Sequence, residues 1–82
     1  MVDQVPLRDM ARNVPVAGRG HPVTRPATLL PVRAWTVARD GSDVEVEAEA
    51  VAWTARAVHV RYFDDAGREG FVWVWASAVT RR

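Results

Sequence analysis

The 82-residue chain contains no cysteine, no lysine and no isoleucine. The absence of cysteine excludes disulfides, thiolate catalysis and every zinc or iron–sulfur site built on thiolates. Because all 11 basic residues are arginine, the chain has the composition that codon bias produces in a GC-rich bacterial genome. Arginine also binds carboxylates and phosphates through a planar fork and stacks on aromatic rings. Side-chain packing alone must therefore stabilise the fold, and arginine carries all the basic chemistry.

Long apolar runs are also absent. The longest strictly apolar run, 71–76, is far shorter than the ~20 residues of a membrane span, and the first residues lack the apolar stretch of a secretory signal peptide. We therefore expect a cytoplasmic protein. The length leaves room for one domain, and hydrophobic and charged contents of 49% and 26% are typical of a globular chain.

Charge is segregated along the chain, although the formal net charge is only +1. Residues 1–39 carry six arginines and two acids, residues 40–65 two arginines and seven acids, and residues 66–82 three arginines and one acid. Such asymmetry is typical of a basic arm that binds nucleic acid, an acidic protein surface or its own domain. Scattered solvated charge produces the same pattern.

All five prolines lie in the first 31 residues. Because proline cannot donate to a strand ladder, residues 1–27 are predicted to form an irregular basic arm, followed by a small β-barrel over 28–82. Within the arm, Leu7, Met10, Ala11 and Val14 have helical spacing, which predicts a short helix over 6–14. So short a helix forms only when it is docked.

From residue 32 the hydrophobic period changes to two, which indicates strands. The pattern predicts strands at 32–39, 44–53, 58–63, 69–75 and 79–81, turns at 40–43, 54–57 and 64–67, and one helical turn at 76–78. Residues 44–58 also fit a helical stripe. We favour a strand because Glu45 and Glu49 would repel each other in a helix.

This order of short strands, with one helical turn before the last, resembles SH3-like barrels, and the stretch 52–80 is similar to their Tudor branch. The similarity lies in Trp53, the alternating segment 58–64, Gly67 and the segment 71–79. It implies an all-β, SH3-like barrel of about five strands. Tudor-type domains often bind methylated arginine or lysine in an aromatic cage, and the resemblance places such a cage near Trp53, Tyr62 and either Phe63 or Trp75.

Catalytic and metal-binding patterns are missing from the sequence. The two histidines, His21 and His59, have no ligand spacing, and neither a Gly-x-Ser-x-Gly motif nor a phosphate-binding loop occurs. The adjacent pair Asp64 and Asp65 is better explained by a turn than by paired-acid catalysis, which needs a concave pocket. We expect no enzymatic activity, no metal and no cofactor.

The segment 71–75 is apolar on both faces, because a period of two places its aromatic residues on one face and its valines on the other. The second apolar face must be covered by the arm, by a second copy or by a partner. We therefore predict a protein-interaction module, acting as an oligomer or as a small subunit or inhibitor of a larger assembly. The predicted partner-binding residues are Phe71, Trp73, Trp75, Trp53 and Tyr62.

The alternative is a nucleic-acid-binding barrel, in which bases stack on aromatic rings and arginines contact phosphates. The acidic middle third argues against it, since such domains usually carry a basic stripe. The candidate phosphate ligands are Arg8, Arg12, Arg19, Arg25, Arg33 and Arg61.

Overall fold

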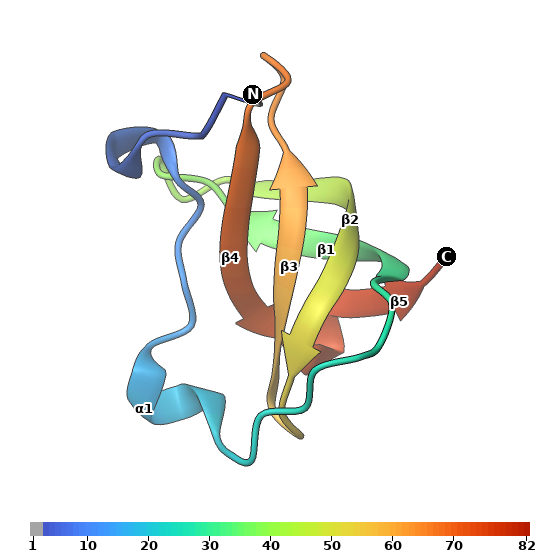
Figure 1. Cartoon of the computed structure of the whole chain (residues 1–82). Helices are drawn as coiled ribbons and strands as arrows, with labels where there is room; N and C mark the ends of the chain where they lie inside the picture. Colours follow the sequence, from blue (N-terminus) through green and yellow to red (C-terminus); the bar gives the residue numbers. More distant parts are fainter. Residues whose placement is uncertain (1–2) are drawn as a thin grey trace.

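Five strands form one antiparallel sheet in the computed structural model, which describes residues 3–82 apart from the side chain of Leu7 (Figure 1). The strands are β1 (Leu30–Val37), β2 (Asp43–Trp53), β3 (Ala57–Phe63), β4 (Glu69–Trp75) and β5 (Val79–Arg81). Their order in the sheet is β4-β3-β2-β1-β5. The predicted small all-β fold is confirmed, but the sheet is open, because β4 and β5 are its two end strands.

The ambiguous segment 44–58 is extended, with β2 running to Trp53 and β3 starting at Ala57. β2 pairs with β1 from Val37 opposite Asp43 to Leu30 opposite Ala50. Glu45 and Glu47 point into solvent, while Ala48 and Ala50 are buried. The alternation of small apolar and charged residues therefore determines the strand, because each residue type has its own face.

The hairpin between β1 and β2 is closed by Asp40. Its carboxylate accepts hydrogen bonds from the hydroxyl and the backbone N–H of Ser42 at 2.6 and 2.9 Å. The Ser42 hydroxyl, followed by its N–H, lowers the pKa of Asp40. Gly41 takes a positive φ of 91° there, a conformation that glycine adopts without a steric penalty.

β2 bends where its pairing with β3 shifts register, between Ala50 and Ala52. In Figure 1 this bend turns β3 and β4 across β1. Since a bulge inserts one residue into one strand, Ala50 and Trp53 both face the core, whereas Ala52 lies opposite His59 on the other face. The bend folds a single sheet around its own core.

The core consists of small and β-branched side chains on the concave face, with Tyr62 as its one large ring. Ala34, Val60 and Val72 are fully enclosed. Tyr62 lies flat against Gly70, where an added Cβ would be 2.6 Å from the ring carbon Cζ. Gly70 is therefore required by the tyrosine rather than by its own backbone conformation.

Gly70→Ala should lower the free energy of unfolding by about 1–3 kcal/mol, because the new methyl overpacks the core. The measurement is urea denaturation in a double-mutant cycle with Tyr62→Leu. The double variant should lose less free energy of unfolding than the two single variants lose together, because leucine relieves the clash. Additive losses would show that Tyr62 does not cause the destabilisation by Gly70→Ala.

The arm contains two short helical turns, the 3-10 helix η1 (Leu7–Asp9) and the helix α1 (Val16–Arg19). The predicted helix over 6–14 is wrong beyond its first turn. The reason is that the N–H groups of Arg12 and Val14 donate to strand carbonyls instead of to a helix. The first two residues of the predicted arm, 1–2, lie outside the described residues.

Residues 11–14, here called the strap, cross the open side of the sheet. The Arg12 N–H donates to the carbonyl of Val37 in β1 at 2.7 Å, and the Val14 N–H donates to the carbonyl of Trp73 in β4 at 2.9 Å. Ala11 and Val14 are buried, and the Ala11 N–H donates to the Tyr62 hydroxyl at 3.4 Å. The strap therefore connects two strands that do not pair with each other.

A side chain completes this connection, since the Trp73 N–H donates to Asn13 Oδ1 at 2.8 Å. Asn13→Ala leaves that N–H without its acceptor and should cost about 0.5–1.5 kcal/mol. The measurement is amide hydrogen exchange, in which Trp73 should lose protection. Asn13→Asp keeps an acceptor oxygen and should retain that protection. Unchanged exchange in the alanine variant would contradict the assigned bond.

Candidate functional site

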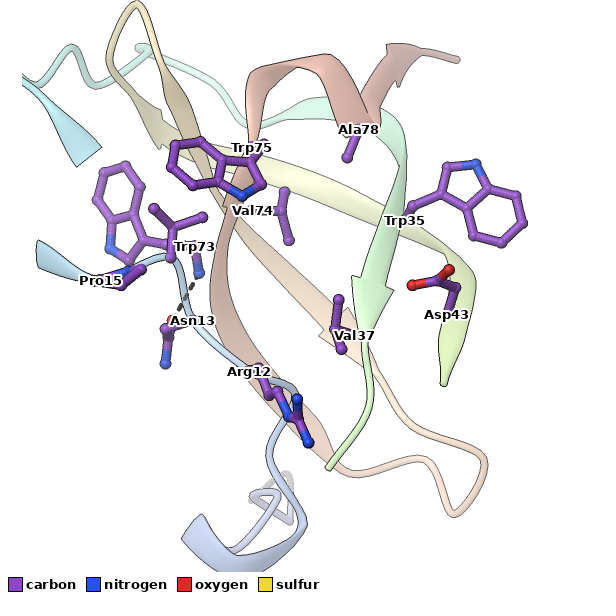
Figure 2. Close-up of a pocket in the computed structure, with 11 residues that line it drawn as sticks. Arg12, Asn13, Pro15, Trp35, Val37, Asp43, Trp73, Val74, Trp75 and Ala78 are labelled. Carbon is purple, nitrogen blue, oxygen red and sulfur yellow. Dashed lines mark hydrogen bonds between the residues drawn. The ribbon is translucent and has the colours of Figure 1, made fainter. Parts of the chain in front are cut away.

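A groove, here called the seam groove, lies where β1 and β4 diverge (Figure 2). Its volume is about 350 Å³. Val37 and Val74 line its floor, and the strap and Ala78 bound its ends. The lining is mostly apolar, which is the usual character of a binding cleft.

Two tryptophans border the seam groove, Trp35 on β1 and Trp75 on β4 (Figure 2). They are 51% and 50% exposed. The ring of Trp75 packs over the backbone of Gly18 in α1, where an added Cβ would lie 3.2 Å from the ring. Exposed large aromatic rings on a small domain mark interaction sites more often than scattered apolar residues do.

The edge of β1 that borders the seam groove is short. Antiparallel strands point alternate residues to opposite neighbours, and Ala38 bonds toward the β2 side through Ser42. Odd-numbered β1 residues therefore point their N–H and C=O away from β2. The pairing of β1 with β5 ends with Ala34 opposite Val79, and the Val37 carbonyl accepts from the strap. Trp35 thus lies between the end of β5 and the strap, beside the seam groove.

One end of the seam groove is charged. Arg12 and Asp43 both line it, and the Arg12 guanidinium donates to the carbonyl of Arg39 at 3.1 Å. This bond fixes the guanidinium at the mouth of the groove. A ligand therefore meets an apolar trough with one cation and one carboxylate at the same end.

Two of the aromatic residues predicted to bind a partner, Phe71 and Trp73, form a ladder with His59 on the convex face of β3 and β4. The His59 and Trp73 rings are stacked, with centroids 4.9 Å apart and planes within 4°. The centroids of the Phe71 and His59 rings are 5.8 Å apart, and their planes are tilted by 46°. The Arg19 guanidinium lies 5.1 Å from the centre of the Trp73 ring. The arm therefore covers part of this second apolar face.

The residues of the aromatic cage that the resemblance implies do not lie together in the structure. Tyr62 is only 6% exposed, in the core. Trp53 lies opposite Val58, and Trp75 lies opposite Ala57. Because adjacent strand residues point to opposite faces, Trp53 and Trp75 are on different sides of the sheet. Phe63 is exposed and contacts the guanidinium of Arg61 at 5.5 Å.

Arg61, a predicted phosphate ligand, is occupied. It forms ion pairs with Glu49 and with Glu69, the latter at 3.3 Å. These carboxylates, first the Glu49 hydrogen bond, raise the pKa of Arg61. A phosphate would have to displace two carboxylates to reach it.

The other predicted phosphate ligands do not form one patch. Arg12 lies at the seam groove and Arg33 on the solvent face of β1, while Arg8 is exposed within η1. Arg19 lies over the Trp73 ring, and Arg25 is exposed.

Of the adjacent acids in the β3–β4 turn, Asp64 binds the turn itself. Asp64 accepts bonds from the N–H of Ala66 and of Arg68 and from the Arg68 guanidinium, at 3.0, 2.8 and 2.7 Å. The Arg68 N–H, ahead of its guanidinium, lowers the pKa of Asp64. Within residues 3–82 no three His, Asp or Glu side chains form a metal-binding group, and no helix in that range has the length and hydrophobicity to cross a membrane.

No family model, no curated protein and no solved structure matches the chain.

Sequence reasoning overlooked the seam groove. Its floor and ends come from three separate parts of the chain, and the strap belongs to a segment expected to be irregular. One signal was present: Trp35 shares the solvent face of its predicted strand with Arg33. A tryptophan at such a position indicates a contact beyond the core.

Burial of the His59 ring, followed by the charges of Arg19 and Arg25, lowers its pKa. The unfolded chain therefore binds more protons than the folded one just below the usual histidine pKa of about 6.5. We expect the free energy of unfolding to fall as the pH decreases from 7.5 to 5.5.

Urea denaturation across that pH range measures the effect. His59→Gln should reduce the slope of stability against pH, whereas the exposed His21→Gln serves as the matched control and should keep it. An identical slope in wild type and His59→Gln would contradict the role of the buried ring.

Proposed function

We propose that the chain is a non-enzymatic protein-interaction module, and that its docking site is the seam groove. The observation that carries the proposal is an apolar groove bordered by two half-exposed tryptophans, Trp35 and Trp75. Tryptophan is enriched at the centres of protein interfaces, where it fills well-packed pockets. The occupant we propose is a segment of a partner protein that offers a bulky apolar side chain.

The groove has defined ends. β5 ends its pairing opposite Ala34, and the strap takes the Val37 carbonyl. The groove therefore admits a short segment of the partner, held mainly by its side chains. A bulky apolar side chain of this segment would fill the trough between Trp35 and Trp75, while Arg12 and Asp43 would orient its polar flank.

The architecture supports a resemblance to SH3-like barrels. A 3-10 helix, η2 (Ala76–Ala78), follows β4, and β5 then returns to pair with β1. This is the strand order with which those barrels bring their ends together. We propose that the chain is an open member of this architectural class, in which the strap occupies the gap.

A self-associating chain and a small subunit of a larger assembly would use the same groove. In both cases an extended segment inserts beside Trp35, supplied by a second copy or by another protein. The cage for methylated side chains finds less support, because Tyr62 is in the core and Trp53 faces away from Trp75.

The test uses a displayed library of random peptides to select a binder, which is then synthesised. Trp35→Gln should weaken that peptide at least about 10-fold, since aromatic anchors at interface centres contribute about 2 kcal/mol or more. Titration calorimetry gives the affinity, and amide NMR shifts should be largest at Trp35 and Val37.

Val23→Gln is the matched control, because Val23 is exposed outside the groove. It should bind like wild type, and both variants should keep a cooperative melt. Selected peptides that shift amides of β3 instead, or that bind the Trp35 variant undiminished, would refute this docking site.

A further inference from the structure

Positive charge gathers at the end of the molecule where β2 and β3 join and where α1 lies (Figure 1). The arm segment 15–25 and the turn 54–57 meet there. These two segments carry Arg19, Arg25, Arg56 and His21, and neither contains an aspartate or glutamate. Basic residues from two separate parts of the sequence therefore lie at one end of the folded molecule.

Three contacts fix the arm against this turn. The Thr54 hydroxyl donates to the Arg19 carbonyl, and the aliphatic part of Arg56 packs against Gly20, where an added Cβ would be 3.5 Å away. Thr24 and Trp53 exchange backbone bonds of 2.7 and 2.8 Å. The basic side chains are thus held together by a defined backbone.

The arginines at this end differ from those elsewhere in the molecule. At the opposite end, Arg68 pairs with Asp64 and Asp9 at 2.7 and 3.4 Å. Within residues 3–82, neither Arg25 nor Arg56 forms an ion pair. Their charges are therefore available to an external anion.

A hollow adjoins these arginines. It has a volume of about 370 Å³ and is lined by Val16, Ala17, Gly20, His21 and Arg56. The aromatic ladder lies nearby, because the Arg19 guanidinium lies 5.1 Å from the centre of the Trp73 ring, which stacks on His59. His59 and Phe71 are half-buried, so part of each ring remains open to solvent.

We propose that this basic end binds single-stranded nucleic acid, with backbone phosphates on Arg25 and Arg56 and bases against the exposed parts of His59 and Phe71. Guanidinium groups bind phosphate through paired N–H donors, and every base can stack on an aromatic ring. Such stacking needs unpaired bases, which selects a single strand over a duplex. This site lies apart from the seam groove and does not depend on it.

The experiment measures fluorescence anisotropy of fluorescein-labelled oligo(dT) and oligo(U) 12-mers with the full chain. In 50 mM salt we expect a Kd within the micromolar range of non-specific binders, about 1–100 μM. Arg25→Gln with Arg56→Gln should weaken binding at least 10-fold. Each lost phosphate contact should also reduce the slope of log K against log salt by about 0.7.

The control is Arg8→Gln with Arg33→Gln, which removes the same charge from exposed positions elsewhere. It should change the affinity less than 3-fold. Phe71→Leu keeps an apolar side chain and should weaken binding several-fold without changing the salt slope. Circular dichroism and melting curves confirm that each variant is folded.

Three results would overturn the proposal: no binding of either 12-mer at 1 mM protein, equal losses in both double variants, or equal competition by a glutamate heptapeptide or by phosphatidylserine vesicles. The last would assign the basic end to acidic protein segments or to membranes. Trp35→Gln should bind both 12-mers normally, so failure of the seam groove and failure of this site are distinguishable.

Discussion

The fold depends on a few hydrogen bonds from the strap to two strands that do not pair with each other. A single five-stranded sheet has two edges, and here they belong to β4 and β5. Val14 bonds to Trp73 in the edge strand β4, and Arg12 bonds to Val37, which lies in β1 beyond the residues that pair with β5. Without this connection the core under Tyr62 would open to water along one whole side. The irregular arm is therefore a structural part of the domain.

The strand pattern was predictable because residue types alternate along the chain with a period of two. Glutamates alternate with valine and alanine in β2, and the predicted limits of β4 and of the η2 turn agree with the structure. The arm was not predictable, because its hydrogen bonds lead to residues such as Val37 and Trp73, distant in sequence. Spacing within the arm indicates a helix, whereas an unpaired strand edge offers its N–H groups better partners.

The candidate site residues could be predicted only in part, because their burial depends on residues distant in sequence. Composition identified the aromatic strand, but the strand pattern could not tell which rings are enclosed. Gly70 leaves room for Tyr62 to enter the core, while the bulge of β2 places Trp53 on the core side. The sequence placed Trp35 on a strand, yet its position beside a groove is evident only once β5 is seen to stop opposite Ala34 and the strap to reach Val37.

The strap has a consequence for synthesis on the ribosome. Residues 3–14 emerge before their partners, which lie as far along the chain as Glu69 and Trp73. Until those strands are synthesised the arm has no strand to bind, and the concave face lacks its last wall. Such long-range contacts slow folding, because the loop must close before the bond is made. A segment made before its partners is thus among the last parts of this domain to become ordered.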